Sequence, residues 1–182
     1  LIGKHNLQNL LLATAAARKI GLKGFDIKEA LTTFEQLPHR LETIYKTDSL
    51  EIINDSKATN FDSSIAGINS VKGRTIIICG GIIKNGDSES WVSAMKEKAN
   101  TIFLFGKSAS ALKLILEKGE FRKEIFIFQE LSELINSVLI YAKTKEIRTI
   151  LFSPSCSSFD QFKNFEERGN EFKSIVKVSL EN

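Results

Sequence analysis

Side chains that could bind a nucleotide or an anion gather first in the loop at residues 54–60, which reads Asn-Asp-Ser-Lys-Ala-Thr-Asn. Asp55 could accept hydrogen bonds from ribose hydroxyls, and Lys57 could neutralise a phosphate or a carboxylate. Thr59 could donate to an anion near a helix N-terminus, where free N–H groups favour negative charge. The same residues also fit a polar turn in which a hydroxyl or amide side chain simply caps the next helix.

A second candidate loop, residues 80–87, reads Gly-Gly-Ile-Ile-Lys-Asn-Gly-Asp and follows an apolar run. Two glycines in that place would let the backbone approach a ligand closely, and Lys84 would project over the end of the preceding strand. The loop matches neither the Walker phosphate loop nor the dinucleotide-binding fingerprint. Taken alone, it also fits an ordinary strand-to-helix turn with a solvated lysine.

A third loop, residues 153–160, reads Ser-Pro-Ser-Cys-Ser-Ser-Phe-Asp and resembles an anion cradle. Ser157 or Ser158 could cap a following helix and also donate to a carboxylate. Cys156 suggests a nucleophile, but the chain has only two histidines and the sequence places neither beside it, so we expect a buried structural thiol. A serine hydrolase of the Gly-x-Ser-x-Gly type is excluded because that motif is absent.

Two shorter patterns lie outside these loops. Asn6 and Asn9 are three residues apart and therefore share one face of a predicted helix. His39 and Arg40 follow Leu-Pro at the place where two parts of the chain should join. Each pattern could bind a ligand, but the first also fits helix-end chemistry and the second a structural salt bridge.

Strand-like and helix-like segments alternate from Arg40 onward and must position these loops. Such alternation predicts an α/β fold with a mostly parallel sheet and helices on both faces, and ligands gather at the carboxyl ends of such strands. The first two strands are separated by a short turn, so we expect an edge hairpin. The predicted strands are 41–46, 50–54, 74–79, 101–105, 124–128 and 148–152, and the predicted helices are 61–70, 88–98, 109–118, 132–143 and 159–176.

Two helices are predicted before this alternation begins, over residues 5–20 and 26–36. Leu and Ala favour the first helix. Asp26, with Glu29 three residues later, resembles a capping box at the start of the second helix, and Pro38 ends that helix. The pair is too short to bury a core alone.

The composition of the chain limits the class of protein to which it can belong. The chain has 182 residues, 42% hydrophobic and 26% charged, which excludes disordered and low-complexity chains. A net charge of +3 is too weak to indicate nucleic acid as the main partner, and no apolar stretch is long enough for a membrane span. Two cysteines without metal-ligand spacing fit a reducing cytoplasm.

Because the chain begins at Leu1 without a methionine, we expect a piece of a longer protein, with a partial domain at 1–37 and a complete one at 38–182.

Taken in order, five motifs resemble the ligases of the MurD type over essentially the whole chain. They are Gly-x-His-Asn-x-x-Asn, Leu-Pro-His-Arg-x-Glu, Asn-Asp-Ser-Lys-Ala-Thr-Asn, Gly-Gly-x-x-Lys and Ser-Pro-x-Cys-x-Ser-x-Asp-Gln-Phe-x-x-Phe-x-x-Arg-Gly. The third and fifth motifs are the specific ones, because the sister Mur ligases and the folylpolyglutamate synthases typically carry other sequences at the first loop.

The resemblance implies an ATP-dependent acid–amino-acid ligase that adds D-glutamate to UDP-N-acetylmuramoyl-L-alanine through an acyl phosphate in peptidoglycan synthesis. It implies that two helices from the end of a central ATP-binding domain precede a Rossmann-like amino-acid-binding domain. ATP and Mg²⁺ are the implied cofactors, with the phosphate loop and the metal ligands in the missing upstream part and no metal site here. We therefore expect the piece to be inactive alone and to work in the cytoplasm with the missing domains of the same chain.

The resemblance also implies roles for ten residues. Lys57 is expected to act at the reacting phosphate as the catalytic residue. The residues expected to bind ATP are Asn6, Asn9, Arg40 and Asp55, and those expected to bind D-glutamate are Thr59, Lys84, Ser158, Phe159 and Phe165. The alternative is a non-catalytic α/β module that binds a nucleotide or an acidic metabolite, and a Gly-Lys-Ser/Thr loop upstream would exclude it.

Overall fold

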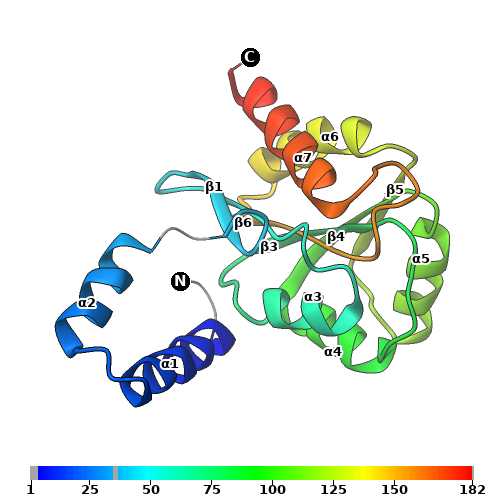
Figure 1. Cartoon of the computed structure of the whole chain (residues 1–182). Helices are drawn as coiled ribbons and strands as arrows, with labels where there is room; N and C mark the ends of the chain where they lie inside the picture. The colour runs from blue at the N-terminus through cyan, green and yellow to red at the C-terminus, as the bar shows by residue number, and fades with distance from the viewer. Residues whose placement is uncertain (1–3, 35–36, 182) are drawn as a thin grey trace.

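The computed structural model describes residues 4–34 and 37–181. Within them, six strands form one sheet in the order β1-β2-β6-β3-β4-β5 (Figure 1). β1 pairs antiparallel with β2 at one edge, and the other neighbours pair parallel. The predicted mostly parallel sheet and its edge hairpin are therefore confirmed. The strands are β1 (Glu42–Lys46), β2 (Glu51–Asn54), β3 (Thr75–Gly80), β4 (Ala99–Phe105), β5 (Glu124–Phe128) and β6 (Thr149–Ser155).

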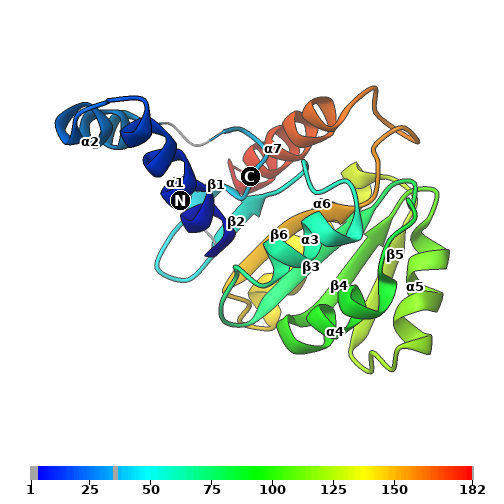
Figure 2. The ribbon, with the colours of Figure 1, turned by 60° about the horizontal axis from the view of Figure 1, so that its bottom comes forward.

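Helices cover both faces of this sheet, as predicted. One face carries α3 (Phe61–Ile68), α4 (Ser88–Lys98) and α5 (Ala109–Lys118), and the other carries α6 (Leu131–Thr144) and α7 (Phe165–Glu181) (Figure 1 and Figure 2). The bounds of α4 and α5 agree with the predicted ones. The result is the three-layer arrangement of a Rossmann-like domain.

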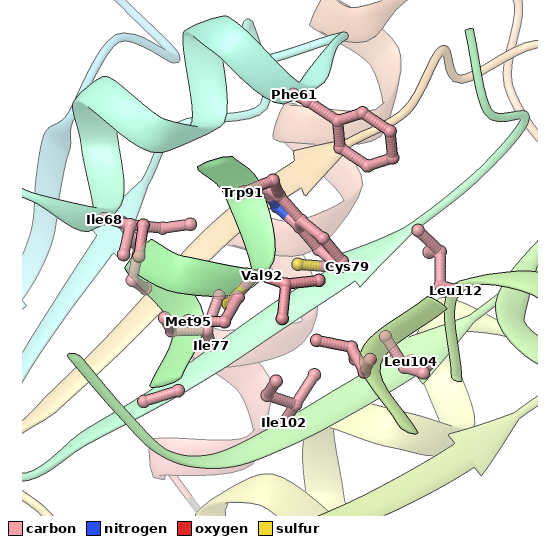
Figure 3. Packing of buried hydrophobic residues seen from close by; sticks show 14 of the residues in the cluster. Phe61, Ile68, Ile77, Cys79, Trp91, Val92, Met95, Ile102, Leu104 and Leu112 are labelled. Carbon is pink, nitrogen blue, oxygen red and sulfur yellow. The ribbon is translucent and has the colours of Figure 1, made fainter. Parts of the chain in front are cut away.

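Two hydrophobic clusters, one on each face of the sheet, hold the layers together. Along β3, Ile77 belongs to the cluster under α3, α4 and α5, whereas Ile76 belongs to the cluster under α6 and α7. This alternation follows from the pleat of a strand, and burial on both faces explains the continuous apolar runs in the sequence. Figure 3 shows the first cluster, in which the rings of Phe61 and Trp91 lie 4.9 Å apart between centroids.

The helices α1 (Lys4–Lys19) and α2 (Gly24–Thr33) form an arm beside the sheet (Figure 2). Most of their large apolar side chains are exposed, and no residue of α2 is buried. This agrees with the expectation that two short helices bury no core of their own. The division into domains at residues 1–37 and 38–182 stays a prediction.

The bounds of α2 differ from the predicted ones. The N-cap is Lys23, whose N–H donates to the Asp26 carboxylate at 3.1 Å, so Asp26 is the third residue of the helix and not its cap. The helix ends at Thr33, and the next residue, Phe34, has an extended backbone with ψ of 115°. The predicted end at Gln36 lies outside the described residues, as do residues 1–3.

The predicted start of the last helix at residue 159 is wrong. α7 begins at Phe165, and the Asn164 side chain accepts a hydrogen bond from the Glu167 N–H at 2.7 Å, as a cap does. The preceding segment forms turns instead of helix. Neither Ser157 nor Ser158 therefore caps a helix, although both side chains are buried.

Candidate functional site

The carboxyl ends of β2, β6 and β3 lie next to one another in the sheet. These strands lead into the loops at 54–60, 153–160 and 80–87 respectively. Because parallel strands end at one edge of the sheet, the three candidate loops meet there. β6 is the last strand of the chain but lies between the other two, so the third loop separates the first from the second.

A buried arginine on α7 joins all three loops. Arg168 is 0% exposed. Its Nε donates to Ser56 Oγ at 3.0 Å, and its terminal nitrogens donate to Ser56 O at 2.8 Å and Cys156 O at 3.0 Å, with Gly80 O at 3.4 Å. Burial lowers its pKa to about 10, which leaves it charged at neutral pH. The rigid fork of guanidinium donors thus sets the spacing of the loops.

Direct backbone bonds also connect the second loop to the third. The Ile82 N–H donates to Ser157 O, and the Ser157 N–H donates to Ile82 O, each at 2.9 Å. The Ile83 N–H donates to the Ser108 hydroxyl at 3.1 Å. Lys84 follows at once and is exposed. The base of the second loop is therefore fixed, and its lysine extends toward solvent.

The paired glycines of the second loop allow a close contact within the protein. Gly81 has φ of 123°, a conformation that other residues rarely adopt. A Cβ on Gly81 would lie 2.1 Å from the carbonyl oxygen of Ser157. The close approach that the sequence indicated is thus an approach to the third loop.

A cavity of about 230 Å³ lies beside the first loop. Its lining includes Asn6 and Asn9 of α1, Arg40, and Asp55 and Lys57 of the first loop. The structure therefore brings together the four residues predicted to bind the nucleotide and the lysine predicted to be catalytic. Two cationic side chains border this space, which favours an anionic ligand.

Asp55 is buried at the edge of this cavity, with 7% of its surface exposed. Its Oδ2 accepts from the Ser153 hydroxyl at 2.9 Å, and its Oδ1 accepts from the Leu41 N–H at 3.3 Å. Burial outweighs these two bonds and the charge of Arg40, and it raises the pKa of Asp55 to about 7. The carboxyl group therefore gains or loses its proton near neutral pH.

Changing Asp55 to asparagine should remove a pH dependence from the folding stability. The pKa is about 7 in the folded chain and about 3.9 in the unfolded chain. Between these values the folded chain keeps the proton and the unfolded chain loses it. The free energy of unfolding should therefore fall by about 4 kcal/mol in total as the pH rises through this window.

Urea unfolding at acid, neutral and mildly alkaline pH measures this effect as the difference between the wild type and Asp55→Asn. Asp62→Asn, which changes an exposed carboxyl group on α3, should retain the fall. Equal pH profiles for the wild type and Asp55→Asn would contradict the account of Asp55.

His39 anchors the segment that carries Arg40. Its ring is buried, and its Nδ1 accepts from the Asn54 side-chain amide at 2.9 Å. Its backbone N–H donates to the Glu42 carboxylate at 3.0 Å. Burial lowers the pKa of the ring, which suits the neutral form that can accept at Nδ1. His39 therefore holds Arg40 at the cavity through its own packing. His39 itself does not line the cavity.

The contact of this ring with α7 leaves no room for a side chain at Gly169. A Cβ there would lie 2.2 Å from His39 Nδ1. Alanine favours helix over glycine, yet Gly169→Ala should lower the free energy of unfolding by about 1–3 kcal/mol through overpacking. Urea unfolding compares it with Asn170→Ala, an exposed neighbour. An equal or higher stability of Gly169→Ala would contradict this packing.

Lys57 lies against the start of α7. Its Nζ is 3.8 Å from the ring centroid of Phe165, a distance at which the aromatic face attracts a cation. The Ser56 hydroxyl donates to the Phe165 carbonyl at 2.8 Å. The structure thus joins the predicted catalytic lysine to one of the residues predicted to bind D-glutamate.

The other residues predicted to bind D-glutamate lie on the same connected loops but outside the first cavity. Thr59 is half-buried and Lys84 is exposed. Ser158 is buried, whereas Phe159 is 67% exposed. Phe159 lines a second cavity of about 370 Å³ together with Asp160 and Gln161. The five residues therefore belong to adjoining loops, and no single described cavity is lined by all five.

Both cysteines are buried without exposure. Burial raises the pKa of Cys156 to about 12 and also raises the pKa of Cys79. A thiolate is therefore strongly disfavoured at neutral pH. The predicted burial of Cys156 is confirmed, and its structural role stays a prediction.

Sequence reasoning missed the residues that hold the site together. Arg168 appeared only as a letter of the last motif, since an arginine in an amphipathic helix is normally solvated. Asn54 donates both to His39 and, at 3.3 Å, to the Gly169 carbonyl. Ser153 bonds the Asp55 carboxyl group. The motif pattern was the only signal that could have found them.

Among residues 4–34 and 37–181, no group of three histidine, cysteine or acidic side chains converges as a metal site. In the same part of the chain, no helix combines the length and the apolar character needed to cross a membrane.

The chain was compared with known protein families and with curated proteins. No protein-family model matches the chain. The chain is 59% identical over 180 residues to a UDP-N-acetylmuramoylalanine–D-glutamate ligase of Prochlorococcus marinus, covering 99% of this chain and 38% of that protein. It is 38% identical over 181 residues to the protein of the same name from Rippkaea orientalis, covering 100% of this chain and 40% of that protein. The chain thus spans about two fifths of the length of these relatives.

Solved structures share the fold at low sequence identity. A Mycobacterium tuberculosis folylpolyglutamate synthase, complexed with ADP and AMPPCP, superimposes with a TM-score of 0.71 at 16% identity, covering 96% of this chain and 41% of that one. A UDP-N-acetylmuramate–alanine ligase from Thermotoga maritima gives 0.70 at 17% identity, covering 98% and 39%. These likenesses support the fold alone.

Proposed function

This chain corresponds to a C-terminal part of the MurD-type ligases, the UDP-N-acetylmuramoylalanine–D-glutamate ligases, and on that premise we propose that it carries the amino-acid-binding domain of such an enzyme. The whole protein is then an ATP-dependent ligase that joins D-glutamate to UDP-N-acetylmuramoyl-L-alanine in peptidoglycan synthesis. The observation that carries the proposal is the meeting of the three motif-bearing loops at one edge of the sheet.

In the proposed reaction, ATP transfers its γ-phosphoryl group to the carboxylate of the acceptor, which gives ADP and an acyl phosphate. The amino group of D-glutamate attacks the acyl carbon and loses a proton, the amide bond forms, and phosphate leaves. Both steps bring anions together, so cationic groups stabilise their transition states. We assign this role within the chain to Lys57, which borders the first cavity and lies on the Phe165 ring.

We assign the nucleotide to the first cavity. Arg40 can pair with a phosphate, Asp55 can accept from a ribose hydroxyl, and Asn6 and Asn9 offer amides from α1. A volume of about 230 Å³ is small for a ligand of this size, because pockets commonly hold about 300–1,000 Å³. The rest of the nucleotide surface is therefore contributed by the remainder of the protein.

We assign D-glutamate to the edge of the sheet where the second loop, the third loop and the start of α7 adjoin, with Thr59 at the end of the first loop. D-Glutamate brings two carboxylates, which need cationic and hydroxyl donors when they leave water. Lys84 offers the cation, and Thr59 and Ser158 offer hydroxyls. Phe159 and Phe165 border the same loops with aromatic rings.

The division of labour between domains follows from this assignment. We propose that residues 1–37 end a central ATP-binding domain and that residues 38–182 form the amino-acid-binding domain. The exposed apolar side chains of α1 and α2 support the first part, because further chain would cover them. We assign the magnesium ligands and the phosphate loop to the rest of the protein, as the resemblance to the MurD-type ligases implies.

Product analysis of the full-length protein tests the proposal. Phosphate release and a ligated product, detected by mass spectrometry, should require ATP, D-glutamate and the UDP-sugar acceptor together, and L-glutamate should not replace D-glutamate. Residues 1–182 alone should release no phosphate above the blank, because the phosphate loop is supplied elsewhere. Ligation of another amino acid would contradict the substrate, and ligand binding without any product would favour the non-catalytic α/β module.

A further inference from the structure

We infer that Asp160 and Gln161 are positioning residues that hold the Ser158–Phe159 segment in the geometry needed to bind D-glutamate. The inference rests on the proposed function of that segment. The inference goes beyond that function because it attributes part of the affinity for D-glutamate to two side chains that need not touch the ligand.

Asp160 ties the third loop to the turn that follows β4. Its Oδ2 accepts from the Lys107 N–H at 3.0 Å. Lys107 lies directly before Ser108, whose hydroxyl accepts from the Ile83 N–H at 3.1 Å. The turn that Asp160 grips is therefore the turn that also supports the loop bearing Lys84.

Gln161 ties the same segment to the turn that follows β5. Its Nε2 donates to the Gln129 carbonyl at 2.7 Å, and its Oε1 accepts from the Leu131 N–H at 3.4 Å. Two consecutive side chains thus grip two successive strand-to-helix turns. We call this pair the Asp160–Gln161 clamp.

The clamp is needed because the segment has no helix or strand of its own. The chain leaves the sheet at Ser157, bonded to Ile82, and becomes helical only at Phe165. Between these points, the Gln161 and Phe162 N–H groups donate to the Ser158 carbonyl, which makes local turns. These turns bond the segment only to itself, so its place on the sheet depends on the packing of Phe162 against the cluster under α6 and α7 and on the clamp. Ordering the segment on binding would cost conformational entropy. The clamp fixes it beforehand.

The Asp160 carboxylate offers a sharp test of the clamp. Its Oδ1 is buried and has no hydrogen-bond partner among the described residues. Asparagine at position 160 can therefore keep the bond to the Lys107 N–H through its carbonyl oxygen, and its amide takes the place of Oδ1 without breaking any described bond. Asp160→Asn preserves the clamp and removes the charge, whereas Asp160→Ala removes both.

Steady-state kinetics of the full-length ligase measure the effect. Asp160→Ala and Gln161→Ala should raise the KM for D-glutamate by about tenfold to a hundredfold, the scale of a misplaced binding group. The KM for ATP should stay within about threefold, because the nucleotide is assigned to another cavity. Asp160→Asn should stay near the wild type. Glu133→Ala, which changes an exposed carboxylate in the first turn of α6, should have no effect.

Three outcomes would overturn the inference: an unchanged KM for D-glutamate in Asp160→Ala, an equal rise of both KM values, or a loss in Asp160→Asn as large as in Asp160→Ala. The last would mean that the charge acts rather than the clamp. A wild type that does not ligate D-glutamate at all would overturn the proposed function as well, and the two failures are told apart by the wild-type assay.

Discussion

Arg168→Ala should lower the free energy of unfolding by about 3–5 kcal/mol, which is an exceptional loss for one substitution. The guanidinium is fully buried and donates to Ser56 in the first loop and Cys156 in the third. Its removal leaves buried carbonyl oxygens without donors, at about 1–3 kcal/mol each, and it also leaves a cavity. Urea unfolding followed by circular dichroism measures the change.

Two further variants sharpen this prediction. Arg168→Lys should rescue little, because one ammonium group cannot reproduce a planar fork that bonds two loops at once. Lys177→Ala, which removes an exposed cation from the same helix, should stay within about 0.5 kcal/mol of the wild type. Full rescue by lysine, or near-wild-type stability of Arg168→Ala, would show that Arg168 does not organise the loops.

Lys84→Ala should raise the KM for D-glutamate in the full-length ligase by about tenfold to a thousandfold, equivalent to about 1.4–4 kcal/mol. A carboxylate that leaves water needs a cationic partner. The Ile82–Ser157 and Ile83–Ser108 bonds fix the base of the loop, so the lysine is held near the third loop. The KM for ATP should change by no more than about threefold, because only the contacted ligand loses affinity.

The fold should survive this change, since an exposed lysine adds little to stability. Lys107→Ala is the matched control. That lysine is also exposed and follows the next strand, and its backbone N–H, not its ammonium group, makes the described hydrogen bond to Asp160. Equal damage to the ATP and D-glutamate kinetics, or none to D-glutamate, would mean that Lys84 is assigned to the wrong ligand.

Much of the fold was predictable because its local signals are strong. Buried parallel strands read as apolar runs, so all six strands were found, and Asp87 caps α4 where its helical pattern begins. The start of α7 was missed because residues 159–164 carry an apolar spacing that suits a helix, while the cap at Asn164 decides the boundary. Strand order was not predictable either, since pairing of β6 between β2 and β3 is a long-range choice.

Some residues of the candidate site were also predictable from the sequence, and others were not. The residues that we propose to face a ligand include charged side chains in loops, so Asp55, Lys57 and Lys84 stand out from the sequence. Residues that hold the loops act through distant partners. Arg168 bonds Ser56 across more than a hundred positions of sequence, and no local pattern reveals such a pair. The sequence therefore indicates the charged loop residues that we propose to contact ligands, but not the distant residues that hold their loops in place.

Hydrogen–deuterium exchange of the full-length protein tests the central claim, that the nucleotide lies against α1, Arg40 and Asp55 whereas D-glutamate lies mainly against the second and third loops. The protein is measured without ligand, with a non-hydrolysable ATP analogue alone, and then with the analogue and the UDP-sugar acceptor before and after D-glutamate is added. The analogue alone should slow exchange in peptides around Asn6–Asn9 and Arg40–Asn60. Added D-glutamate should slow it further around Gly81–Gly86 and Ser157–Phe165. Protection of these last two segments by the analogue alone, with no further change when D-glutamate is added, would contradict the account.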